Sequence, residues 1–205
     1  MCIKKLFLTA LTATAASLAA FSALAALEFP LQLEEKTFDI QSQGFFLSAL
    51  VPVQFHETFI KNDEMEIYRY NTEQNRLSVE FQIIALSDGK YEEIVQGKFQ
   101  ELILAPFSDK ENQLFGEYEI LKDTHEGNER MFEYQGYLKT PANSFSAGMK
   151  NMLHEAYMLK GRRLIRVACT VQGLQEEDLL TRQIFFNVND NCSEIISSVK
   201  VREKE

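Results

Sequence analysis

Hydrophobic and polar residues alternate along Arg163–Val171, and this is the clearest pattern in the chain. Because side-chain direction in a β-strand repeats every two residues, the alternation predicts a strand with one face on a core and the other at least partly wet. A second extended run, His154–Leu159, precedes it, and Gly161 between the two suits a tight turn. The sequence therefore predicts a central β-hairpin. The residues expected on its core side are Ile165, Val167, Cys169 and Val171.

Similar alternations predict further strands on both sides of this hairpin. In Arg76–Ile83, apolar and polar side chains alternate without a break. A polar stretch separates this run from Met65–Tyr70, so the two are expected to form an antiparallel hairpin. Its polar second face argues against a parallel sheet covered on both sides. The other predicted strands are Thr37–Ile40, Phe45–Val51, Phe115–Asp123, Arg130–Leu138 and an edge strand at Val199–Val201.

Two regions have the spacing of helices instead. Apolar residues recur every three or four positions from Tyr91 to Ile103, which predicts an amphipathic helix that covers the sheet. Ser87 or Asp88 is expected to cap its start, and Pro106 to end it.

The C-terminal region is predicted to hold two helices. Leu179–Phe185 has helical spacing. Asn191–Glu194 has the form of a capping box, in which two side chains bond the backbone N–H groups at a helix start. The pattern therefore predicts a second, short helix that ends at Ser197.

The first 25 residues have the three parts of a secretory signal. Lys4 and Lys5 are followed by the apolar run Leu6–Leu24 and by a small-x-small cleavage pattern at Ala23–Ala25. The alternative is an uncleaved membrane anchor, but the run is rich in alanine and contains threonine and serine, which favours cleavage. We expect a signal peptide over residues 1–25, one domain over residues 26–205, no membrane span after cleavage, and a periplasmic or secreted protein.

Composition and charge limit the classes of partner. The 205-residue chain is 45% hydrophobic and 25% charged, with a formal charge of −9. These values are ordinary for a globular domain. Loss of Lys4 and Lys5 with the leader makes the mature chain more acidic still. A field of this sign repels phosphate groups, so nucleic acid is disfavoured as a partner, and the acidic excess otherwise indicates solubility.

Two cysteines remain in the mature chain, Cys169 and Cys192. In an oxidising compartment such a pair can form a disulfide, which would stabilise the fold by roughly 3 kcal/mol. The alternative is two separately buried thiols that behave as small apolar residues. The spacing is not Cys-x-x-Cys, so thiol redox catalysis has no support.

Candidate catalytic and metal-binding motifs are incomplete. His56, His125 and His154 are each followed by glutamate, but the second histidine that His-Glu-x-x-His requires is replaced in every case. Ser146 lacks the Gly-x-Ser-x-Gly frame of a hydrolase nucleophile. We therefore predict no catalytic residue, no metal and no cofactor, although a site assembled from residues distant in sequence stays open.

Basic residues concentrate around the predicted hairpin turn of this otherwise acidic protein. Such a patch can bind an acidic surface of a protein partner, or it can be no more than a solvated hairpin tip. The residues are Lys160, Arg162, Arg163 and Arg166.

The order of the predicted strands and helices can be compared with that of known folds. Strands and a hairpin centred on Phe81 precede a helix over Tyr91–Phe107, hairpins around Gly127 and Gly161 follow, and a helix closes with Glu194–Val199. This order, with the closing Ile-Ile-x-Ser-Val, resembles the PsbP-like and DcrB-like exported proteins of the Mog/PsbP-like fold.

The resemblance covers residues 36–202 and implies an α+β class, with an antiparallel sheet sandwiched by helices (α/β/α). It implies a non-enzymatic accessory or assembly factor, and it supplies no site residue. The first hypothesis is therefore an exported binding or assembly module of the cell envelope that acts through protein–protein contacts. The alternative is a small-ligand carrier, or a hydrolase whose site is built from residues distant in sequence.

Overall fold

The structure is a computed structural model that describes most of the chain after the predicted leader. The signal segment and the expected helix end at Pro106 lie outside the described residues. The described residues are 29–41, 43–62, 64–72, 76–101, 103, 115–127, 129–139, 149–174 and 178–204.

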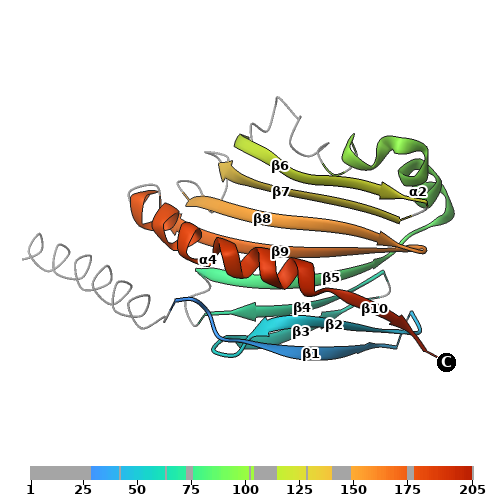
Figure 1. Ribbon diagram of the computed structural model, residues 1–205, viewed down its shortest axis with the longest axis horizontal. Coiled ribbons are helices and arrows are strands. Elements are labelled where there is room, and N and C mark those ends of the chain that lie inside the picture. Colours follow the sequence, from blue (N-terminus) through green and yellow to red (C-terminus); the bar gives the residue numbers. More distant parts are fainter. Residues whose placement is uncertain are drawn as a thin grey trace, which may run out of the picture.

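The larger of the two sheets has seven strands in the order β3-β4-β5-β9-β8-β7-β6, and each described pair of neighbours is antiparallel (Figure 1). The hairpin predicted around residues 65–83 is present as β4 and β5. The edge strand β3 was not predicted. The strands are β3 (His56–Lys61), β4 (Met65–Asn71), β5 (Leu77–Ala85), β6 (Phe115–Glu126), β7 (Glu129–Lys139), β8 (Met149–Lys160) and β9 (Arg163–Leu174).

The smaller sheet has three strands and joins the two ends of the described chain. β2 lies in the middle, with β1 and β10 antiparallel on its two sides. The edge strand predicted at the C-terminus is thus present as β10. Phe45 and Leu47 on β2 are fully buried, so this sheet contributes to the main core. The strands are β1 (Leu33–Ile40), β2 (Phe45–Pro52) and β10 (Lys200–Glu203).

The predicted central hairpin is β8 and β9, joined by a two-residue turn between Lys160 and Arg163. Gly161 has φ = 58°, a conformation that glycine adopts at little cost. On β9 the four residues predicted to face the core are at most 1% exposed: Ile165, Val167, Cys169 and Val171. The period-two pattern therefore places the core correctly.

The main core lies between one face of the large sheet, the small sheet and the helix α4 (Asp178–Ser198) (Figure 1). α4 crosses β8 and β9 closely. At Gly173 of β9 a Cβ atom would come within 1.7 Å of Thr181 Oγ1 on the helix, so only glycine fits at this crossing. The helix buries Ile184, Phe185 and Val188 in the core.

The prediction of two C-terminal helices is wrong, because α4 is one continuous helix. Asn191 does not cap a helix start. Its side-chain Oδ1 instead accepts the backbone N–H of Leu31, 3.0 Å away and 160 residues earlier in the chain. The asparagine that suggested a capping box therefore binds the distant backbone of Leu31 and not a helix start.

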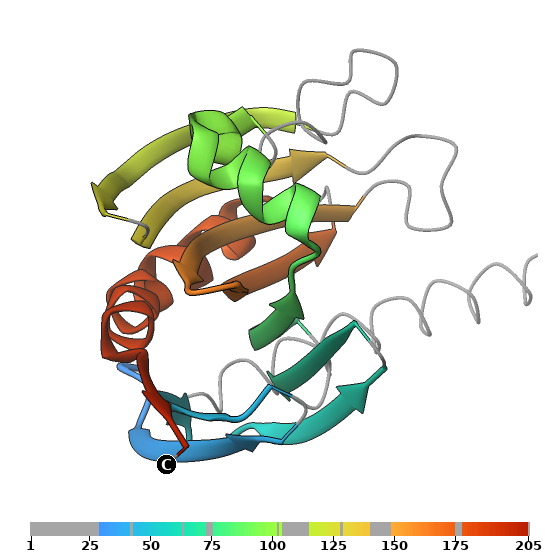
Figure 2. The same cartoon turned by 90° about the vertical axis from the view of Figure 1, so that its right-hand side faces the viewer.

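The predicted amphipathic helix begins as α2 (Asp88–Glu93) and continues as the π-helical turn η1 (Ile94–Lys98). Its N-cap is Ser87, as expected, although the serine side chain makes no capping bond. The predicted apolar stripe is buried in a second cluster, which consists of Ile94, Phe99, Ile103, Phe132, Tyr134 and Leu159. α2 lies beside the β6–β7 end of the large sheet (Figure 2).

Candidate functional site

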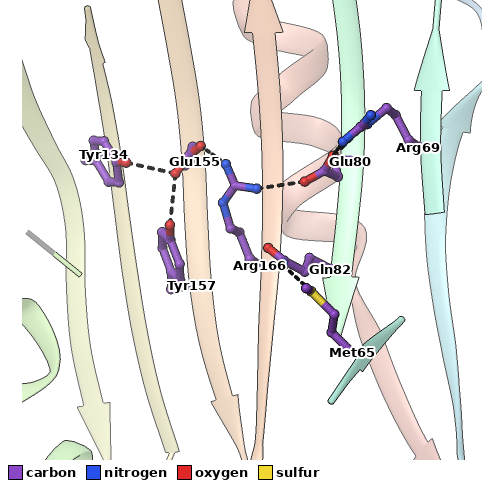
Figure 3. Close-up of polar contacts among 8 residues, drawn as sticks. All are labelled: Met65, Arg69, Glu80, Gln82, Tyr134, Glu155, Tyr157 and Arg166. Carbon is purple, nitrogen blue, oxygen red and sulfur yellow. Dashed lines mark hydrogen bonds and ion pairs between the residues drawn. The ribbon is translucent and has the colours of Figure 1, made fainter. Parts of the chain in front are cut away.

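A row of charged side chains crosses the face of the large sheet opposite α4 (Figure 3). Glu80 on β5 lies between two arginines from the neighbouring strands. Its Oε2 atom is 2.6 Å from Nη2 of Arg69 on β4, and its Oε1 atom accepts a 2.9 Å bond from Nη1 of Arg166 on β9. One carboxylate therefore bridges two guanidinium groups, a strong charge-assisted arrangement.

The row continues from Arg166 toward β7. The other guanidinium nitrogen of Arg166 pairs with Oε1 of Glu155 on β8. Oε2 of Glu155 accepts hydrogen bonds from the hydroxyls of Tyr134 at 2.8 Å and Tyr157 at 3.1 Å. We call the row Arg69–Glu80–Arg166–Glu155, with its two tyrosines, the charge ladder.

The charge ladder is partly exposed at its Arg69 end and buried at its Tyr134 end. The side chain of Arg69 is 40% exposed, whereas that of Glu155 is 3% exposed and Tyr134 is fully buried. Burial, and then the carboxylate of Glu155, raise the pKa of Tyr134 and of Tyr157. Burial lowers the pKa of Arg166, but Glu155, Tyr157 and Glu80 together raise it more, so the net shift is upward. These groups therefore keep their protons at neutral pH.

A groove of about 520 Å³ lies over the exposed end of the ladder. Its lining joins Arg69, Glu80 and Arg166 to hydroxyl and amide side chains from four strands, and it is mostly polar. Such a surface offers fixed donors, acceptors and charges of both signs, and it suits a polar ligand or a polar protein surface. The remaining lining residues are Thr58, Asn71, Ser78, Ala168, Thr170 and Gln172.

Each residue of the predicted basic patch has an acidic neighbour. Lys160 pairs with Glu129, and Arg162 pairs with Asp88. Arg163 Nη1 is 2.6 Å from Glu203 Oε1, and this hydrogen bond lowers the pKa of the Glu203 carboxyl. These three basic residues lie at the hairpin turn, whereas Arg166 belongs to the charge ladder and lines the groove.

The two cysteines are free and buried, Cys169 on β9 and Cys192 on α4. Burial raises the pKa of the Cys169 thiol well above its usual value, and the neighbouring Cys192 adds to the shift. A thiol held in its protonated form is a poor nucleophile. Both thiols are free in the structure, so the predicted disulfide is not confirmed.

His154 belongs to a polar cluster beside a second hollow of about 340 Å³. Its Nε2 atom lies 2.8 Å from Glu133 Oε1, and its Nδ1 atom lies 2.9 Å from Asn189 Oδ1 on α4. The ring is fully buried, and of this cluster only Glu133 lines the hollow. The cluster thus joins α4 to the sheet, and its imidazole does not reach the hollow.

In the described parts of the chain, no group of three or more His, Cys, Asp and Glu residues is arranged to hold a metal ion. Among the described residues, no helix combines the length and the apolar character that a bilayer span needs.

Sequence reasoning identified Arg166 but missed the rest of the ladder. Glu80 and Glu155 occupy the polar positions of alternating strands, where they look like ordinary solvent-facing residues. The sequence does place one glutamate on each of the two strands that flank the strand of Arg166. Recognising them as its partners requires the strand order β5-β9-β8, which the sequence does not provide.

No protein-family model matches the sequence, and no curated protein matches it significantly. Among solved structures, the Ran-binding protein Mog1p of Saccharomyces cerevisiae is similar, with TM-score 0.44, 11% identity, and coverage of 82% of this chain and 96% of that one. Cyanobacterial PsbP from Synechocystis gives TM-score 0.45 and 10% identity, covering 86% and 95%. LpqN of Mycobacterium tuberculosis, described as involved in cell envelope biogenesis, has a TM-score of 0.41 and 9% identity. The match covers 83% of this chain and 92% of LpqN. These are similarities of structure alone, at about 10% identity.

Proposed function

We propose that the chain is an exported, non-enzymatic binding module of the cell envelope, built as a PsbP-like helix–sheet–helix sandwich. It contacts a protein partner through the groove over the charge ladder. The observation that carries the proposal is this groove, with its polar lining and its fixed charges of both signs. Export rests on the leader pattern of residues 1–25.

The ladder makes the groove a preorganised surface. Arg166 is held from both sides by Glu80 and Glu155, so its guanidinium does not have to be ordered when a partner binds. Ordering of side chains is one of the costs of association, and a preformed surface reduces it. Because the four ladder charges balance, a partner with polar groups of both kinds is favoured over a purely acidic or basic one.

Site-specific cross-linking in cells tests the groove. A photo-reactive amino acid is placed at Thr170, inside the groove, and in a matched strain at Ser193, an exposed residue of α4 beside the other hollow. We expect a discrete adduct with one envelope protein from position 170 that disappears when Arg69→Glu is added. Equal adducts from both positions, or a position-170 adduct that Arg69→Glu leaves unchanged, contradict the proposal.

Export is tested separately, because an adduct at position 170 does not show that the leader is removed. N-terminal sequencing of the protein recovered from its host is expected to begin at residue 26. Recovery of the intact chain in the cytoplasmic fraction contradicts the envelope assignment without affecting the groove.

A further inference from the structure

The large sheet ends in two different edges. β6, at one end, has register shifts against β7 between Phe115 and Tyr118 and between Ile120 and Lys122. Such irregularities twist an edge strand and hinder pairing with another chain. β3, at the other end, pairs with β4 in unbroken register, and all of its residues are exposed. β3 is therefore the regular edge of the described sheet.

The direction of the outward backbone groups of β3 follows from the turn that connects it to β4. The N–H of Asn62 donates to the carbonyl of Met65 at 3.0 Å. Because backbone groups alternate in direction along an antiparallel strand, the even-numbered residues of β3 face β4. The N–H and C=O groups of Glu57, Phe59 and Lys61 therefore point away from the sheet, toward solvent.

We propose that two copies of the chain pair through their β3 strands, antiparallel and about a twofold axis at Phe59. Hydrogen bonding requires that outward-facing residues lie opposite one another, so the register can shift only in steps of two. Only one such register pairs all three outward-facing residues, Glu57, Phe59 and Lys61, with outward-facing residues of the second copy. It places Phe59 opposite Phe59 of the second copy, and Glu57 opposite Lys61 of the second copy. A twofold interface of this kind is closed and limits the assembly to a dimer.

The central pair continues an aromatic row that already crosses the sheet. Phe81 on β5, Tyr68 on β4 and Phe59 on β3 lie directly opposite one another. The ring centroids of Phe59 and Tyr68 are 4.7 Å apart, yet Phe59 is still 50% exposed at the edge. Aromatic side chains directly opposite each other are among the favourable cross-strand pairs. A second copy would cover Phe59 with the same residue.

The flanking charges favour a second copy over an arbitrary strand. Glu57 and Lys61 lie on the same face of β3 as Phe59, and their side chains are 38% and 45% exposed. Each has an intramolecular partner, Lys36 on β1 for Glu57 and Glu66 on β4 for Lys61. In the proposed register each carboxylate gains a second cation and each ammonium a second anion, twice per dimer, so the edge is complementary to itself.

A charge-swap experiment tests this register. The protein, expressed from its full-length sequence and processed by its host, is examined by sedimentation velocity over a concentration series, together with Glu57→Lys, Lys61→Glu and the double variant. The strand is short, so we expect a weak, reversible wild-type dimer. Each single reversal replaces two attractive pairs by two repulsive ones and should raise the dimer dissociation constant about tenfold or more. The double variant restores both pairs and should return close to wild type.

Mixing the two single variants gives the sharpest result. Each is expected to remain monomeric alone, whereas their mixture should form a heterodimer, because the lysines of one then face the glutamates of the other. The matched control carries the charge reversals Lys122→Glu and Glu126→Lys on β6, the opposite edge strand of the sheet. These changes should not alter the dimer dissociation constant. A wild-type protein that stays monomeric up to about 1 mM, or a dimer that the β3 reversals leave unchanged, overturns the proposal.

Discussion

Replacing Arg166 by methionine should destabilise the fold far more than replacing an exposed arginine. The guanidinium lies between Glu80 and Glu155, with a side chain only 22% exposed. Removing one partner of a buried ion pair costs about 3–5 kcal/mol, because the remaining charge stays buried and uncompensated. Glu80 keeps its contact with Arg69, so Glu155 alone is left without a cation. We therefore expect a loss of about 3 kcal/mol in the free energy of unfolding.

Urea unfolding followed by far-ultraviolet circular dichroism measures this loss, and the chain has no tryptophan that could serve as a fluorescence probe. The matched control is Arg162→Met on the same hairpin. Its ion pair with Asp88 is exposed, with 64% and 77% of the two side chains accessible, so it should cost no more than about 1 kcal/mol. Adding Glu155→Gln to Arg166→Met removes the unpaired charge and keeps an acceptor for the tyrosines. The double variant should recover about 1–2 kcal/mol relative to Arg166→Met.

Two results would refute this account of the charge ladder. If Arg166→Met costs no more than Arg162→Met, the ladder is not a stabilising unit. If the double variant is as unstable as Arg166→Met, the cost comes from lost packing of the arginine stem and not from the charge on Glu155. An unchanged slope of free energy against urea is required for both comparisons, because a changed slope means that the denatured state has changed.

Three further outcomes follow from contacts elsewhere. The raised pKa values of Tyr134 and Tyr157 contribute stability that is complete below about pH 10 and is lost as the pH rises further. An alkaline titration followed by phenol absorbance should therefore show that these two tyrosines ionise at a higher pH in the folded protein than in the unfolded protein. Gly173→Ala should cost about 3 kcal/mol in urea unfolding, and Thr181→Ala in the same chain should recover part of it. Asn191→Ala should cost about 2 kcal/mol by the same measurement, because a buried backbone N–H loses its acceptor.

How far the sequence predicts this fold depends on how many faces of each strand are buried. β9 covers the main core with one face, and the resulting period-two pattern locates both the strand and its core residues. β3 was missed because all six of its residues are exposed. An edge strand of this kind needs no alternation of apolar and polar residues, so Phe59 and Ile60 stand side by side in the sequence without any pattern.

The helices show the limit of local motifs. The stripe from Tyr91 to Ile103 identified the helical segment that buries Ile94 and Phe99. The capping-box pattern at Asn191 gave a false helix start, because an asparagine can satisfy a backbone N–H near it in sequence or far from it. Here it bonds Leu31, and only the folded chain brings the two together.

The charge ladder could not be predicted because it depends on register between distant strands. Glu80 and Arg166 are 86 residues apart, and their contact requires that β5 and β9 be neighbours with Gln82 opposite Arg166. A shift of one residue would turn one of the two side chains to the other face of the sheet. The sequence gives the polar face of each strand but not the alignment of one strand with the next.

The raised pKa values of Tyr134, Tyr157 and Arg166 disfavour these three groups as general acids or bases. A general acid or base works best when its pKa is near the operating pH. The pKa values of Tyr134, Tyr157 and Arg166 are all raised, so each keeps its proton throughout the physiological range. Their groups therefore act as permanent hydrogen-bond donors, and the arginine as a permanent charge. Of these three groups only Arg166 lines the groove, where it presents the same positive charge throughout the physiological pH range.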